Sequence, residues 1–141
     1  MDAASAVTAA VAFVWLGMVL AISFLEAPLK FRAPGVTLSL GLGIGRLVFR
    51  ALNRVEMLLA VAVAVTVVAD DAPAAVTVAG AVTLTVLAVQ LLLVRPGLNR
   101  RSDRVLAGED LPRSRAHLVY IAAEVIKVVA LSILGIRALM T

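Results

Sequence analysis

The sequence predicts an all-α fold, an integral membrane four-helix bundle with an interfacial amphipathic segment before the second span. Of the 141 residues, 62% are hydrophobic and only 16% are charged, and the mean hydropathy is +1.07. Soluble domains average roughly 25% charged and 45–50% apolar residues, so this chain has too few polar side chains to cover a water-exposed surface. In addition, four segments approach the roughly 20 apolar residues that cross the hydrocarbon core of a bilayer.

The four spans belong to a single membrane domain covering residues 1–141. We expect them at residues 3–25, 52–69, 74–94 and 117–136. Pro28 is expected to end the first span, because proline pushes the preceding residue out of the α region, and Arg95-Pro96-Gly97 is expected to close the third. A signal peptide is the alternative for the first span, but Met1-Asp2 supplies no positive charge and the apolar stretch exceeds the usual length of about 7–15 residues.

Residues 36–51 are predicted to form the amphipathic segment. Arg46, Arg50 and Arg54 recur every four residues and therefore share one helix face, together with Asn53. We expect this segment to lie along the membrane interface and to bend into the second span near Asn53.

The run Gly-Leu-Gly-Ile-Gly at residues 41–45 weakens the expectation of a regular helix there, since each glycine costs roughly 1 kcal/mol against alanine in a helix interior. A phosphate-binding loop is the alternative interpretation of this run. It is rejected because no strand precedes the run and no Gly-Lys-Ser/Thr follows it.

The positive charges lie almost entirely on one side of the predicted spans. Five Lys and Arg residues lie between the first span and the uncharged part of the second, counting Arg54 at the start of that span, and six lie between the third and fourth, whereas the opposite side has only Arg137. Positively charged short loops stay in the cytoplasm, so we expect a multi-pass plasma-membrane protein with both termini outside and residues 95–115 as a cytoplasmic basic loop.

These charges also predict a partner, the anionic headgroups of the lipid bilayer. The expected headgroup-binding residues are Arg46, Arg50, Arg100, Arg101 and Arg104. Nucleic acid is the other partner that a basic chain suggests. It is excluded here because Trp15 and Tyr120, the two best stacking side chains, fall inside spans.

Two ionisable residues lie deep in the fourth span. Charges in the bilayer core cost roughly 2.5–3.5 kcal/mol each on insertion scales, so Glu124 and Lys127 must face protein rather than lipid. With His117, Tyr120 and Gly135 they fall on one helical stripe.

Polar residues of the other spans are expected at the same level, in the inner half of the bundle. The predicted polar cluster contains Glu26, Glu56, Gln90, Tyr120, Glu124 and Lys127, with Arg54 and His117 at its mouth. Glu124 and Lys127 either neutralise each other as a structural pair or form a transport site, and the sequence leaves both alternatives open.

Several short motifs resemble a known family. Trp15-Leu16-Gly17, the segment Glu26-Ala27-Pro28-Leu29-Lys30-Phe31 and the run Gln90-Leu91-Leu92-Leu93-Val94-Arg95-Pro96 are similar to the small four-helix bacterial membrane proteins of the transmembrane-205-like family. Gly45-Arg46-Leu47-Val48-Phe49 and a histidine at the start of the last span add to the similarity. The resemblance covers most of the chain and implies a four-helix membrane architecture without an established chemistry.

Three classes of function follow from these patterns. A non-enzymatic scaffold or accessory subunit is favoured, with small residues at Ala75, Ala79 and Gly80 allowing close approach in a homo-oligomer or to a membrane-protein partner. The alternative is a transporter or channel subunit that binds a cation or proton at Glu124. An enzyme is disfavoured, and neither a metal nor a cofactor is expected, because the chain has no Cys and a single His.

Overall fold

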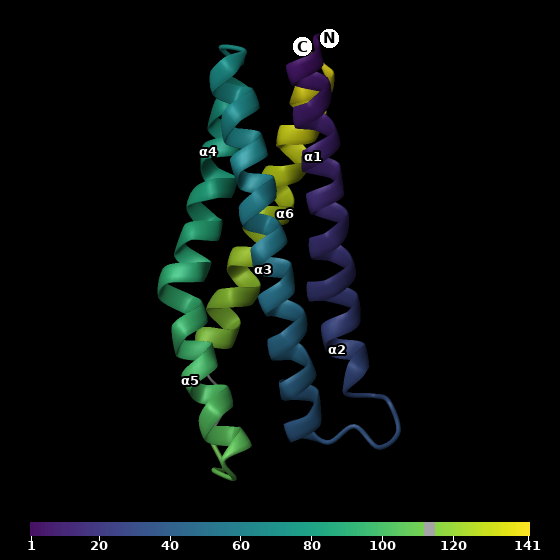
Figure 1. Ribbon diagram of the computed structural model, residues 1–141, viewed down its shortest axis with the longest axis vertical. Helices are drawn as coiled ribbons and strands as arrows, with labels where there is room; N and C mark the ends of the chain where they lie inside the picture. Colours follow the sequence, from purple (N-terminus) through teal and green to yellow (C-terminus); the bar gives the residue numbers. More distant parts are fainter. Residues whose placement is uncertain (112–114) are drawn as a thin grey trace.

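The computed structural model describes residues 1–111 and 115–141, and in these ranges it contains helices and connecting turns but no strand. The chain forms four long helical rods (Figure 1). The rods consist of α1 (Ala3–Val19) with η1 (Leu20–Glu26) and α2 (Ala27–Lys30), α3 (Leu38–Ala69), α4 (Ala74–Val89) with η2 (Gln90–Val94) and α5 (Arg95–Leu106), and α6 (Arg115–Leu139). Each rod is long and apolar enough to cross a membrane, which confirms the predicted all-α membrane bundle.

The rods alternate in direction. Both termini and the turn between α3 and α4 lie at one end of the bundle, here called the terminal end (Figure 1). The connections that follow α2 and α5 lie at the other end, here called the basic end because it holds the arginine-rich segments.

Two prolines that were expected to end spans lie inside helical rods instead. The first rod continues past Pro28 to Lys30, and the third continues past Pro96 to Leu106, so neither proline ends its helix as expected. A π-helical segment precedes each proline. There the Ala27 N–H donates to the Ile22 carbonyl and the Arg95 N–H donates to the Gln90 carbonyl, both five residues back. These wider turns relieve the clash and the lost hydrogen bond that proline imposes on an α-helix.

The third rod also changes the expected basic loop. The first part of residues 95–115 is the helix α5, which extends the third span without a break, so this part was wrongly predicted as a loop. Arg113, which was counted among the cations of the loop, lies outside the described residues.

The helix α3 is uninterrupted from Leu38 to Ala69, so the bend expected near Asn53 is absent. The amphipathic segment is the first half of this helix. All three glycines of the run are helical, and two of them make room for neighbouring side chains: a Cβ on Gly41 would overlap the Phe31 ring, and one on Gly45 would lie 3.1 Å from Nζ of Lys30. The Lys30 and Phe31 side chains at the end of the first rod thereby pack against α3.

The core is centred on α6, which packs against both α1 and α4. Trp15, Leu131 and Leu134 are fully buried in it, and Val63 of α3 closes the same cluster. The outward faces carry large apolar side chains such as Leu92, which is 73% exposed. A surface of this kind suits lipid and not water.

Two of the small residues expected at a dimer interface are used inside the bundle. Ala79 and Gly80 are buried, and a Cβ on Gly80 would contact Val63 of α3 and Leu134 of α6 at 3.6 and 3.9 Å. The close helix approach that they permit is therefore within one chain, which corrects the expectation for this face.

Replacing Gly80 tests this packing. We expect Gly80→Ala to be tolerated, because the added Cβ makes only ordinary contacts, and Gly80→Leu to destabilise the bundle by about 1–3 kcal/mol through overpacking. The unfolding midpoint in detergent micelles measures both effects. Gly17→Leu is the matched control, because nothing lies within 4 Å of a Cβ at Gly17. Equal destabilisation by the two leucine variants would contradict the assignment.

Candidate functional site

A fully buried group of charges lies between three of the rods. Nζ of Lys127 on α6 lies 2.5 Å from Oε2 of Glu56 on α3 and 2.5 Å from Oε1 of Glu124, one turn earlier on α6. It also donates a 2.8 Å hydrogen bond to Oε1 of Gln90 in η2. Glu56, Gln90, Glu124 and Lys127 are at most 2% exposed, and they are called the ion cluster below.

The first rod closes the ion cluster with two further hydrogen bonds. Nε1 of Trp15 donates to Oε2 of Glu56 at 2.8 Å, and Oγ of Ser23 in η1 donates to Oε2 of Glu124 at 2.6 Å. Within the cluster, Nε2 of Gln90 donates to Oε1 of Glu124 at 2.7 Å. All four rods therefore meet at this level through polar side chains.

The ion cluster lies on one plane of the bundle. Counted from the terminal end at about 1.5 Å per residue, Trp15, Glu56 and Lys127 all lie roughly 20 Å along their helices. A hydrocarbon core is about 30 Å thick, which leaves the cluster about 10 Å inside the boundary nearer the basic end. At this depth a charge without a partner is costly.

The charges in the cluster do not cancel completely. Lys127 has three N–H donors and three oxygen acceptors, so the ammonium group is satisfied. Two carboxylates share this single cation. Oε1 of Glu56 is buried and makes no hydrogen bond within residues 1–111 and 115–141. The arrangement can hold helices in register, and it has a spare acceptor for one proton.

Two of the residues predicted for the cluster lie outside it. The Glu26 side chain is 37% exposed, its Oε1 lies 3.6 Å from Nζ of Lys30 on its own rod, and its Oε2 is buried without a hydrogen bond among the described residues. Tyr120 is buried one turn before Glu124 on α6, toward the basic end, but its hydroxyl group makes no hydrogen bond of normal geometry in the described part of the chain. The structure thus brings together Glu56, Gln90, Glu124 and Lys127 of the six.

The residues predicted at the mouth lie nearer the basic end. Arg54 is exposed and lines a small depression of about 200 Å³ with Asn53 and Arg95. His117 is an exposed residue at the start of α6 that lines a larger cavity, described below.

The predicted headgroup-binding arginines differ in their surroundings. Arg46 pairs with Asp103 of α5, and Arg104 donates to Glu109 at 2.7 Å, so both have acidic partners within the chain. Arg50 and Arg100 are exposed, whereas Arg101 is partly buried.

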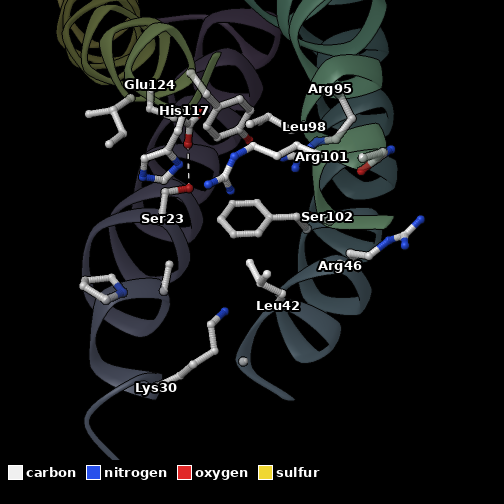
Figure 2. A pocket seen from close by; sticks show the side chains of 18 of the residues that line it. Ser23, Lys30, Leu42, Arg46, Arg95, Leu98, Arg101, Ser102, His117 and Glu124 are labelled. Carbon is white, nitrogen blue, oxygen red and sulfur yellow. Dashed lines mark hydrogen bonds between the residues drawn. The ribbon is translucent and has the colours of Figure 1, made fainter. Parts of the chain in front are cut away.

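A cavity of about 450 Å³ adjoins the ion cluster at the basic end (Figure 2). Its walls come from η1 and α2, from the first half of α3, from α5 and from the start of α6. Ser23 and Glu124, which are joined by a hydrogen bond, form the side nearest the cluster. Lys30, Arg95 and Arg101 contribute cationic side chains to its lining.

Ionisable groups with shifted pKa values lie at both ends of the bundle, outside the spans. At the terminal end, a hydrogen bond from the Ser5 backbone N–H lowers the pKa of Asp2, which caps α1, while the hydrogen bond with Asp2 raises the pKa of Asp70. At the basic end, the hydrogen bond with Glu109 raises the pKa of Arg104. In the described ranges, no three His, Cys, Asp or Glu side chains are grouped so as to hold a metal ion.

Sequence reasoning did not assign Trp15, Ser23 or Arg95 to a site. The signal for Trp15 is the need of a buried indole N–H for an acceptor, whereas Ser23 gave no signal because it lies in the π-helical η1, where the phase of a regular α-helix is lost. Arg95 was taken as the end of a span, and only the continuation of the helix through Pro96 places it inside the bundle.

Comparisons with protein-family models, with curated proteins and with solved structures give no match. The resemblance to the transmembrane-205-like family therefore stays a prediction.

Removing Lys127 tests the ion cluster. We expect Lys127→Met to destabilise the protein by about 3–5 kcal/mol, because it leaves two carboxylates buried without a cation. Arg137→Met is the control, since it removes an exposed cation from the last turn of the same helix. The unfolding midpoint measures stability, and the emission of Trp15, the only tryptophan, reports on its bond to Glu56. Similar midpoints for the two variants would refute a stabilising role.

Proposed function

We propose that this protein is a non-enzymatic membrane scaffold or accessory subunit whose ion cluster holds its four helices in register. The observation that carries the proposal is the complete satisfaction of Lys127 by oxygen atoms from α3, η2 and α6, with the ammonium group fully buried. A buried charge network of this kind contributes more to a unique arrangement than to net stability, because desolvation offsets much of the attraction. It suits a protein whose task is to present a defined surface.

We place the protein in the plasma membrane, with the basic end in the cytoplasm and both termini outside. The proposal is supported by the charge asymmetry together with the shared position of the two termini and the turn between α3 and α4 (Figure 1). Anionic lipid headgroups are the partners proposed for the basic end, where Arg50 and Arg100 are exposed. The outward apolar faces of the bundle are the surfaces that a second copy or another membrane protein would contact.

A second candidate function is favoured by one observation. Glu124 belongs to the ion cluster and also lines the cavity at the basic end, so it connects the buried charges with a space that opens away from them. The spare carboxylate acceptor in the cluster could take up one proton from that side. These features are what a small proton or cation carrier would need at the entry to its pathway.

Glu124→Gln separates the two candidates. The substitution keeps the volume of the side chain and removes its charge, and we expect a lower unfolding midpoint with no change in ion flux, because Gln90, Ser23 and Lys127 lose a charged partner. Proton and sodium flux is measured in proteoliposomes with an imposed gradient. Glu26→Gln is the control, as it neutralises a carboxylate outside the cluster. A flux present in the wild type and lost selectively in Glu124→Gln would favour the carrier.

The proposed orientation has its own test. Reporter domains are fused at Gly108, in the turn after α5, and at the carboxyl end after Thr141. We expect the first reporter in the cytoplasm and the second outside, since the two positions lie at opposite ends of the bundle. Reporters that are active in the same compartment would contradict the four-span topology, and reversed compartments would contradict only the orientation.

A further inference from the structure

The cavity at the basic end differs from the ion cluster because its polar groups are not satisfied. Nε and Nη2 of Arg95 and the hydroxyl group of Tyr120 are buried beside one another, and none of them makes a hydrogen bond of normal geometry to a described residue. Tyr120 is only 6% exposed. Buried donors without acceptors are rare in folded proteins, and each calls for an acceptor from outside the chain.

Arg95 is held rigidly at this position. Its guanidinium carbon lies 5.0 Å from the ring centroid of Phe49 and 4.6 Å from that of Tyr120, and the two rings meet edge to face at 5.9 Å. No carboxylate of residues 1–111 or 115–141 pairs with it. The aromatic groups thus orient a cation whose counter-charge is not supplied by the described chain.

The charge of the cavity lining is strongly positive. Lys30 and Arg101 join Arg95 there, and Figure 2 shows the Lys30 side chain extending from α2 toward the other labelled residues. Two of the lining cations have acidic partners: Arg46 is paired with Asp103, and Nζ of Lys30 lies 3.6 Å from Oε1 of Glu26. Among the described lining residues Glu124 is the only acidic one, and its charge is already neutralised by Lys127. The excess of cations favours an anion.

The level of the cavity indicates what kind of anion can reach it. At about 1.5 Å per residue, Ser23 and Arg95 lie roughly 30 Å from the terminal end and Lys30 roughly 40 Å. The hydrocarbon core is about 30 Å thick, so the cavity occupies the headgroup layer just beyond it. Phe24 and Ile121 line the cavity and are also exposed on the outer surface, which provides an apolar side toward the membrane.

We propose that this cavity binds the phosphate headgroup of an anionic membrane lipid. Arg95 and Tyr120 donate hydrogen bonds to the phosphate oxygens, Lys30 and Arg101 add positive charge, and the acyl chains leave past Phe24 and Ile121. The site is distinct from the exposed arginines of the basic end and does not depend on the scaffold role. Free phosphate offers the same oxygen acceptors as a lipid headgroup, but it has no acyl chains to contact the apolar side of the cavity.

The test measures lipid retention by native mass spectrometry. The full chain is reconstituted in phosphatidylcholine nanodiscs that contain a rising fraction of phosphatidic acid, and the bound lipid is titrated. We expect Arg95→Gln to weaken phosphatidic acid binding by about tenfold or more and Tyr120→Phe by about threefold, as charge-assisted bonds are the stronger ones. Arg32→Gln is the matched control, because it removes the same charge from an exposed position in the turn after α2 that does not line the cavity, and it should change the affinity less than about twofold.

Each other outcome overturns the proposal. Equal losses in Arg95→Gln and Arg32→Gln would mean that lipid binds by general surface charge. Displacement of the lipid by inorganic phosphate at equal concentration would assign the site to a soluble anion. Should Arg95→Gln unfold, Tyr120→Phe decides the matter, because it keeps the ring that stacks on Arg95 and removes only the hydroxyl group. Unchanged retention in a folded Tyr120→Phe variant would then refute the site.

Discussion

The ammonium group of Lys127 is tolerated at membrane depth only because three oxygen atoms surround it. These oxygens come from Glu56 on α3, Gln90 in η2 and Glu124 on α6, so the three helices must keep one register for the charge to be satisfied. A slip of one turn in any of them would leave a charge or an amide in hydrocarbon without a partner. Trp15 and Ser23 extend the same constraint to the first rod.

The two π-helical segments make this convergence possible. Each lies just before a proline, and each contributes one polar side chain to the centre of the bundle: Ser23 from η1 and Gln90 from η2. A wider turn shifts the helical phase, so these side chains point inward at the level of the ion cluster. The same turns let the helices continue, and the continuing parts, α2 and α5, become walls of the cavity.

The ion cluster and the cavity adjoin each other, but they differ in whether their hydrogen-bond donors have acceptors. In the cluster, the donors of Lys127, Gln90 and Trp15 have acceptors. In the cavity, Arg95 and Tyr120 present donors without acceptors. Glu124 belongs to both, so a ligand in the cavity would lie next to the groups that fix the helix register. Such contact offers a physical route by which lipid composition could influence the stability of the bundle.

Composition and spacing alone determined the four spans, their alternating direction and the protein-facing stripe of Glu124 and Lys127. These features depend on the cost of placing charges in hydrocarbon, which is large and can be evaluated one helix at a time. The tertiary structure decided the partners. Glu26 lies apart from the ion cluster while Trp15 and Ser23 contact it, and Ala79 and Gly80 pack inside the chain. The helical phase changes at the π-helical segments, and interhelical packing depends on all four rods together, so the spacing of residues along the sequence reveals neither.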